Sequence, residues 1–268
     1  MKTHDPLTAF DLGPVLDWLE ANRAKIAPRM EWLNEPGPMY TAVKDGDKIH
    51  LDQFQISNVI GLFPEGMRQN STLAHIQGRD TTWFIKGMTS DNPRITTSIG
   101  EALYPRAFVP GHTDLVKWDD NDKQQFIELY HLPGVSHDVA AWMTAHALIH
   151  EFVHTLISPL WYTKTWPRLR IPGHKETANV ATFLAKFAMA ASKCPPMSHY
   201  SAAQRPLPHD CNHPEFIVRV GEELCESVVA YFQGFIYCEE VERQFEPFVD
   251  RPEVLQLVED FINAVPES

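Results

Sequence analysis

Apolar and polar residues follow two different patterns along the chain. Over residues 11–33 the apolar residues recur at helical spacing, with Asp11 as the expected cap and Pro14 in the first turn. Between about 34 and 135 the apolar runs are short and β-prone, and turn residues separate them. Four of these runs predict strands: TTWFIKG (81–87), PRITTSIG (93–100), TDLVKWD (113–119) and QQFIELYHL (124–132).

From Ser136 onward the periodicity is mostly helical. It predicts helices near residues 137–157, 175–193, 214–246 and 252–265, with a proline-rich loop over 194–214. We therefore expect an α+β fold with a small N-terminal sheet and a mainly helical C-terminal half. Residues 1–135 would form the N-terminal helix and the sheet, one wall of a cleft. Residues 136–268 would carry the functional helices, most simply within one compact domain.

The predicted helix 137–157 is apolar on nearly every side, yet it carries His146, His150 and His154 at four-residue spacing and Glu151 among them. Such a helix should be buried, and buried ionisable groups need partners. Two histidines one turn apart can present ring nitrogens to one cation, and zinc favours such ligands. Glu151 would then lie beside the metal, where a carboxylate can serve as general base.

This arrangement is the HExxH pattern, written here as HEFVH over 150–154. A simpler alternative is a pair of hydrogen-bonded core histidines with Glu151 reaching solvent. His146 is either a further ligand or a residue that supports one.

A zinc site of this kind needs a further protein ligand. The metzincin extension is absent, because Ile157 and Leu160 stand where glycine and histidine would be. The best candidates lie in the segment 213–235, which predicts a helix with its apolar residues gathered on one face. Glu222 stands at the border of that apolar arc, and Glu226 follows one turn further on.

On the same helix, Glu223 points away from the apolar arc. We expect its carboxylate to be exposed to solvent, as is common for glutamate.

HEFVH followed by a helix with a Glu-x-x-x-Glu pattern resembles the gluzincin group of zinc metallopeptidases, and EELCESVVAYF is similar to the corresponding helix of antirestriction-type zinc peptidases. The resemblance implies a zincin-like fold and one Zn²⁺ ion held by His150, His154 and Glu222. It also implies that Glu226 orients a ligand histidine.

Other residues compete for the place of the third ligand. Glu226 could bind the metal itself. Glu176 follows His154 by 22 residues, a spacing close to that of thermolysin-like gluzincins, and His174 stands nearby.

The resemblance implies a zinc-dependent hydrolase that cleaves peptide or similar amide bonds with a metal-activated water. Residues 126–132 are our candidate for the strand that lines the cleft. His199, Tyr200 and Tyr162 are candidates to donate a hydrogen bond to a developing oxyanion. Two alternatives stay open: a zincin-fold enzyme acting on a small molecule, and a zinc-binding protein without catalysis.

The composition of the chain bears on its partners and its cellular location. The net charge of −12 disfavours nucleic acid as a partner. No apolar run is long enough for a membrane span, so we expect none. Four cysteines without CxxC spacing predict free thiols and a reducing, cytoplasmic location.

Overall fold

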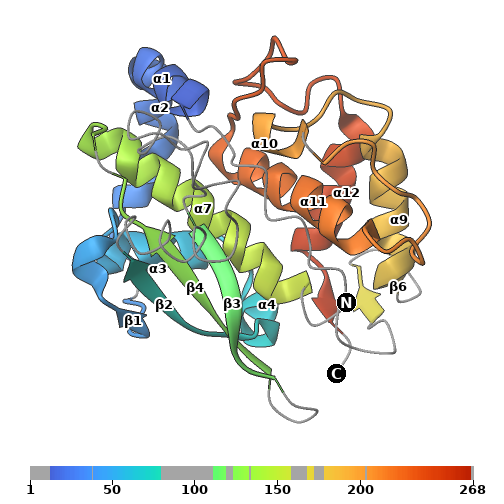
Figure 1. Cartoon of the computed structure of the whole chain (residues 1–268), viewed down its shortest axis with the longest axis horizontal. Helices are drawn as coiled ribbons and strands as arrows, with labels where there is room; N and C mark the ends of the chain where they lie inside the picture. The colour runs from blue at the N-terminus through green and yellow to red at the C-terminus, as the bar shows by residue number, and fades with distance from the viewer. Residues whose placement is uncertain are drawn as a thin grey trace, which may run out of the picture.

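The computed structural model describes residues 13–37, 39–79, 111–118, 123–132, 134–157, 168–171, 178–202 and 204–266. Within these ranges the protein is a mixed structure of helices and strands (Figure 1). The predicted strands at 81–87 and 93–100, together with Asp11, Tyr162, His174 and Glu176, lie outside the described residues.

The larger sheet has four strands in the order β1-β2-β4-β3. Their bounds are Val43–Lys44 (β1), Leu73–Arg79 (β2), Lys123–Tyr130 (β4) and Gly111–Trp118 (β3). The first three run parallel, and β3 is antiparallel to β4. The predicted strands 113–119 and 124–132 correspond to β3 and β4, whereas β1 and β2 were not predicted.

The strand chosen as the cleft wall, 126–132, is not an edge strand. It falls on β4, which has hydrogen-bonded neighbours on both sides, β2 and β3. Its backbone groups are therefore already paired. Among the described strands, β3 is the one that presents an unpaired edge beside β4.

The prediction of one helix over 11–33 is wrong in detail. The chain forms α1 (Gly13–Ala21), α2 (Arg23–Ile26) and the 3-10 helix η1 (Ala27–Asn34). Pro28 stands at the start of η1. Because proline lacks an N–H and its ring clashes with the carbonyl four residues earlier, the α-helical path cannot continue through this position.

The segment 34–135 also contains helices where only short strands were predicted. These are η2 (Gly46–Lys48), α3 (Gln53–Gly61) and α4 (Glu65–Asn70). A capping box starts α3: the Asp52 side chain accepts from the Gln55 backbone N–H, and the Gln55 side chain accepts from the Asp52 N–H. This signal is visible in the sequence and was missed.

The predicted central helix is present as α7 (His137–Ile157). It packs against β3 and β4 of the sheet and against α11 (Phe216–Gln233), as Figure 1 shows. Nearly all of its residues are buried, as its apolar surface predicted.

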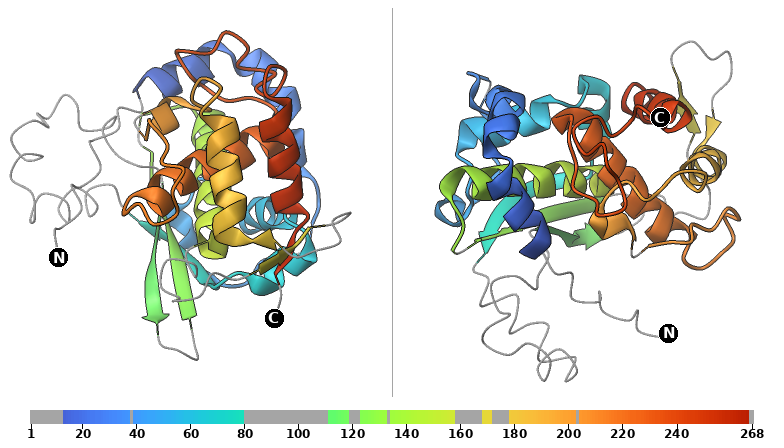
Figure 2. Two further views of the ribbon diagram at one scale, coloured as in Figure 1. Left: turned by 90° about the vertical axis from the view of Figure 1, so that its right-hand side faces the viewer. Right: turned by 90° about the horizontal axis from the view of Figure 1, so that it is seen from above.

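Around α11 lie α9 (Val180–Ala191), α10 (His199–Ala202) and α12 (Pro252–Ile262), and α9 and α12 are side by side in both views of Figure 2. The predicted helix 214–246 is too long. It ends at Gln233 because Gly234 adopts φ +70, a left-handed conformation that terminates helices.

A second, antiparallel sheet has the order β6-β5-β7 and joins Ala178–Asn179, Arg168–Arg170 and Val265–Pro266. The buried apolar residues form one cluster that extends from Val15 to Ala264. The large sheet and the C-terminal helices thus share a core, and α7 lies where they meet. None of the described helices combines the length and the apolar character needed to cross a membrane.

Candidate metal centre

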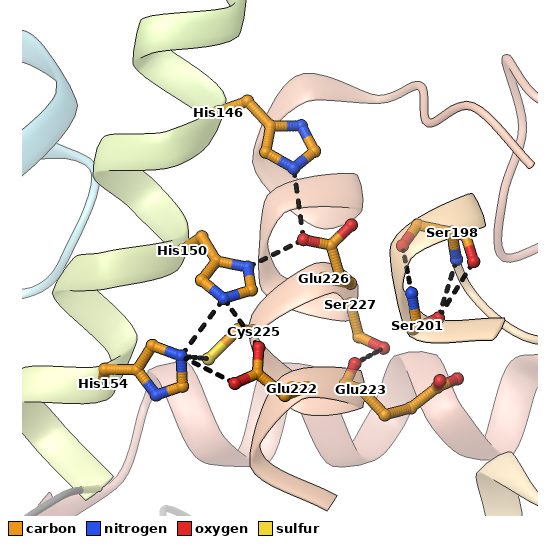
Figure 3. A network of polar contacts seen from close by, with 10 residues as sticks. All are labelled: His146, His150, His154, Ser198, Ser201, Glu222, Glu223, Cys225, Glu226 and Ser227. Carbon is orange, nitrogen blue, oxygen red and sulfur yellow. Dashed lines mark hydrogen bonds and ion pairs between the residues drawn. The ribbon is translucent and has the colours of Figure 1, made fainter. Parts of the chain in front are cut away.

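Two imidazoles of α7 and one carboxylate of α11 converge on one point (Figure 3). His150 Nε2 lies 3.1 Å from His154 Nε2 and 2.9 Å from Glu222 Oε2. His154 Nε2 lies 3.5 Å from Glu222 Oε1. Both histidines are buried, with 7% and 8% of their surface exposed.

These separations are close to the donor spacing around a tetrahedral zinc ion, and the two from His150 Nε2 are shorter than it by about 0.2–0.4 Å. Metal–nitrogen and metal–oxygen bonds of about 2.0–2.2 Å place the donor atoms about 3.3–3.5 Å apart. Neutral imidazole and carboxylate are donors that zinc prefers. The three side chains therefore have the donor chemistry of a zinc site, and they lie close enough together to surround one ion after a shift of a few tenths of an ångström.

Glu226 contacts the other nitrogen of His150. His150 Nδ1 lies 2.7 Å from Glu226 Oε1, and His146 Nε2 lies 3.2 Å from the same oxygen. A proton on His150 Nδ1 that is donated to Glu226 leaves the lone pair of Nε2 directed towards Glu222 and His154. The structure thus places Glu222 with the converging nitrogens, and Glu226 and His146 behind His150.

The cluster concentrates charge in a buried place. Burial raises the pKa of Glu222, but the His154 and His150 imidazoles outweigh it and hold that pKa below its ordinary value. Burial likewise raises the pKa of Glu226, and His146 and His150 bring it below its ordinary value.

The same contacts change the pKa of His150 in the opposite direction. Burial lowers its pKa, yet the hydrogen bonds to Glu222 and Glu226 raise it well above its ordinary value. Without a metal, charged imidazole has to balance the carboxylates. A divalent cation would balance the same carboxylates with neutral histidines, the form that binds metals.

Glu151 is buried, with 6% of its surface exposed. The alternative in which Glu151 reaches solvent is therefore wrong. Burial raises the pKa of Tyr130 on β4 and of Tyr200 at α10, and the charge of Glu151 adds to both shifts.

Of the candidate oxyanion donors in the described ranges, Tyr200 is the one beside the histidines. Its ring centroid lies 5.7 Å from that of His150, at an interplanar angle of 74°. Burial raises its pKa well above the ordinary value, followed by the charges of Glu222 and Glu151. His199 instead contacts the ring of Tyr237.

Cys225 belongs to the centre and was missed in the sequence. Its Sγ lies 3.8 Å from His154 Nε2, and the residue is fully buried. The signal was present, because a residue three positions from Glu222 lies only about 60° away around the helix axis. Cys225 was instead counted among the apolar residues of the helix.

Glu223 contradicts its predicted exposure. Only 1% of its surface is exposed, and Oε1 accepts from Arg205 Nη2 at 2.7 Å and from the Met197 backbone N–H at 3.1 Å. The helical periodicity correctly predicted that Glu223 lies outside the apolar face of the helix. Its carboxylate is nevertheless buried, because residues of the loop 194–214 cover that side of α11.

A small cavity of about 40 Å³ adjoins the centre on the side of His146 and Glu226. Its walls are mixed aromatic, aliphatic and polar, and they come from α1, α7, the region of α10, α11 and the chain after α11. The aromatic wall residues are Trp18, Trp142, Tyr200, Phe235 and Tyr237.

Comparison of the chain with protein-family models, with curated proteins and with solved structures gives no match in any of the three.

Proposed function

We propose that this protein is a zinc-dependent hydrolase of the gluzincin type, with a zincin-like fold, that cleaves peptide or similar amide bonds. One observation carries the proposal: His150 Nε2, His154 Nε2 and the Glu222 carboxylate converge to within 3.5 Å of one another, close to the spacing of tetrahedral zinc ligands. The HEFVH order of residues then places a buried carboxylate, Glu151, next to the first ligand.

Each side chain of the centre has a role in such a reaction. Bound zinc would supply Lewis acidity, polarising a substrate carbonyl and lowering the pKa of a water molecule. Glu151 takes the proton of the attacking water and passes it to the leaving nitrogen. Glu226 holds His150 in the tautomer that binds through Nε2. The phenol of Tyr200 donates a hydrogen bond to the oxygen that becomes negative.

The edge of the sheet supports a peptide substrate. β3 packs against α7 and has one neighbour among the described strands. An extended peptide can pair with such an edge through its backbone.

The part of the cavity that Tyr200 lines beside His150 supports a second candidate, an enzyme acting on a small molecule. The His146 and Glu226 walls of the cavity instead lie behind His150. With about 40 Å³ of space the cavity accommodates a group no larger than a few water molecules. We also propose a reducing, cytoplasmic location, which the four free cysteines support.

The substitution Glu151→Gln tests the proposed reaction. The amide keeps the shape of the side chain but cannot accept the proton, so turnover should fall at least about 100-fold. Zinc content by elemental analysis and the far-ultraviolet circular dichroism spectrum should stay at wild-type values. Turnover is measured by mass spectrometry on a mixture of unstructured peptides.

Hydrolysis by Glu151→Gln at the wild-type rate would exclude Glu151 as the base. A zinc-loaded wild-type protein that leaves every peptide of the mixture intact would instead contradict the peptide substrate.

A further inference from the structure

We propose that the thiolate of Cys225 is a fourth protein ligand, so that the resting metal centre is closed by His150, His154, Glu222 and Cys225. This inference rests on the proposed zinc site. It departs from the pattern that HEFVH predicts, in which three protein ligands leave the fourth position to water.

The spacing of the sulfur supports this assignment. A zinc–sulfur bond of about 2.3 Å and a zinc–nitrogen bond of about 2.0–2.1 Å set the two donors about 3.5–3.6 Å apart in a tetrahedral site. Cys225 Sγ lies 3.8 Å from His154 Nε2. The donor atoms of His150, His154 and Cys225 all lie within 4.8 Å of one another.

The position of Cys225 on α11 is equally consistent with a ligand. Glu222 and Cys225 stand three residues apart, so both side chains face α7 from adjacent turns of one helix. A buried cysteine is often a small apolar residue among apolar neighbours. Here the sulfur contacts an imidazole nitrogen that already faces a carboxylate, a setting that apolar packing does not require.

Closure by a thiolate has a chemical consequence. The thiol releases its proton to solvent when the metal binds, because only the thiolate is a ligand. Water reaches the fourth position only after the sulfur leaves it and takes up a proton again. The protein should therefore bind zinc tightly and hydrolyse substrate slowly. Removal of the sulfur should weaken zinc binding and leave the fourth coordination position to water.

Cobalt substitution tests the ligand directly, without any activity measurement. One equivalent of Co²⁺ added to the metal-free full-length protein should give the visible d–d bands of a tetrahedral site and a near-ultraviolet thiolate-to-cobalt charge-transfer band. Cys225→Ser should lose the charge-transfer band and keep d–d bands. Cys238→Ser, a matched change at another buried thiol, should keep both.

A chelator competition provides the second measurement, in which Cys225→Ser should hold zinc at least about tenfold more weakly than wild type. Strong d–d bands without charge transfer in the wild-type protein would overturn the thiolate ligand and leave the zinc site standing. Absence of both bands in wild type would overturn the zinc site itself. The wild-type spectrum decides both points even if Cys225→Ser fails to fold.

Discussion

The two nitrogens of His150 have different partners, and this difference assigns roles to the acids around it. Nδ1 faces Glu226, whereas Nε2 faces Glu222 and His154. The resemblance to gluzincins implied that Glu222 binds the metal and Glu226 supports a histidine, but the spacing alone could not separate the two, because one helical turn divides them on the same side of the helix. Only the position of α7 relative to α11 distinguishes them.

We expect Glu226→Gln to weaken zinc binding about 10- to 100-fold, because the neutral amide holds His150 less firmly and lowers its basicity. Affinity is measured by competition with a chromophoric chelator. Glu215→Gln, at the exposed start of the same helix, should leave the affinity unchanged. Equal affinities of Glu226→Gln and wild type would show that Glu226 does not support the ligand.

Among the elements, α11 joins the candidate site to the rest of the helical half. One face carries Glu222, Cys225 and Glu226 towards α7. A neighbouring face, about 100° around the helix axis from Glu222, carries Glu223, whose carboxylate accepts from Arg205 and from the backbone of Met197 in the loop 194–214. The ion pair is buried, with 19% of the Arg205 side chain and 2% of the Glu223 side chain exposed.

Glu223→Ala should lower the free energy of unfolding by about 3 kcal/mol, because it leaves the Arg205 charge and a buried N–H without their acceptor. Urea unfolding followed by circular dichroism measures the change. Glu253→Ala removes an exposed partner of Lys193 and should cost less than about 1 kcal/mol. If the two substitutions cost the same, the ion pair of Glu223 does not anchor the loop.

The type of an element was predictable where its pattern was continuous between clear turn or cap signals. The helix 137–157 and the strands β3 and β4 follow from such patterns. The end of α11 was missed because apolar residues continue past Gly234, where a left-handed backbone rather than polarity stops the helix. β2 was not predicted because its residues, LAHIQGR, mix polar and apolar positions. The polar Gln77 can be buried there because its side chain donates a hydrogen bond to Glu128 on β4.

Across the whole molecule, one apolar cluster connects the sheet with the C-terminal helices. His150 and Glu222 are 72 residues apart, and this shared core brings α7 and α11 together. The sequence supplied the donor types and their local spacing. It could not supply the approach of the two helices, and for that reason Tyr200 and the cavity were placed beside the histidines only by the structure.

The central claim is that the nitrogens of His150 and His154 hold a divalent cation together with Glu222. Crystals grown with equimolar zinc and measured on both sides of the zinc absorption edge test it most directly. We expect one strong anomalous difference peak within bonding distance of both Nε2 atoms and the Glu222 carboxylate, about 2.0–2.2 Å from each. A map without a peak between these three side chains would contradict the metal site and the hydrolase built on it.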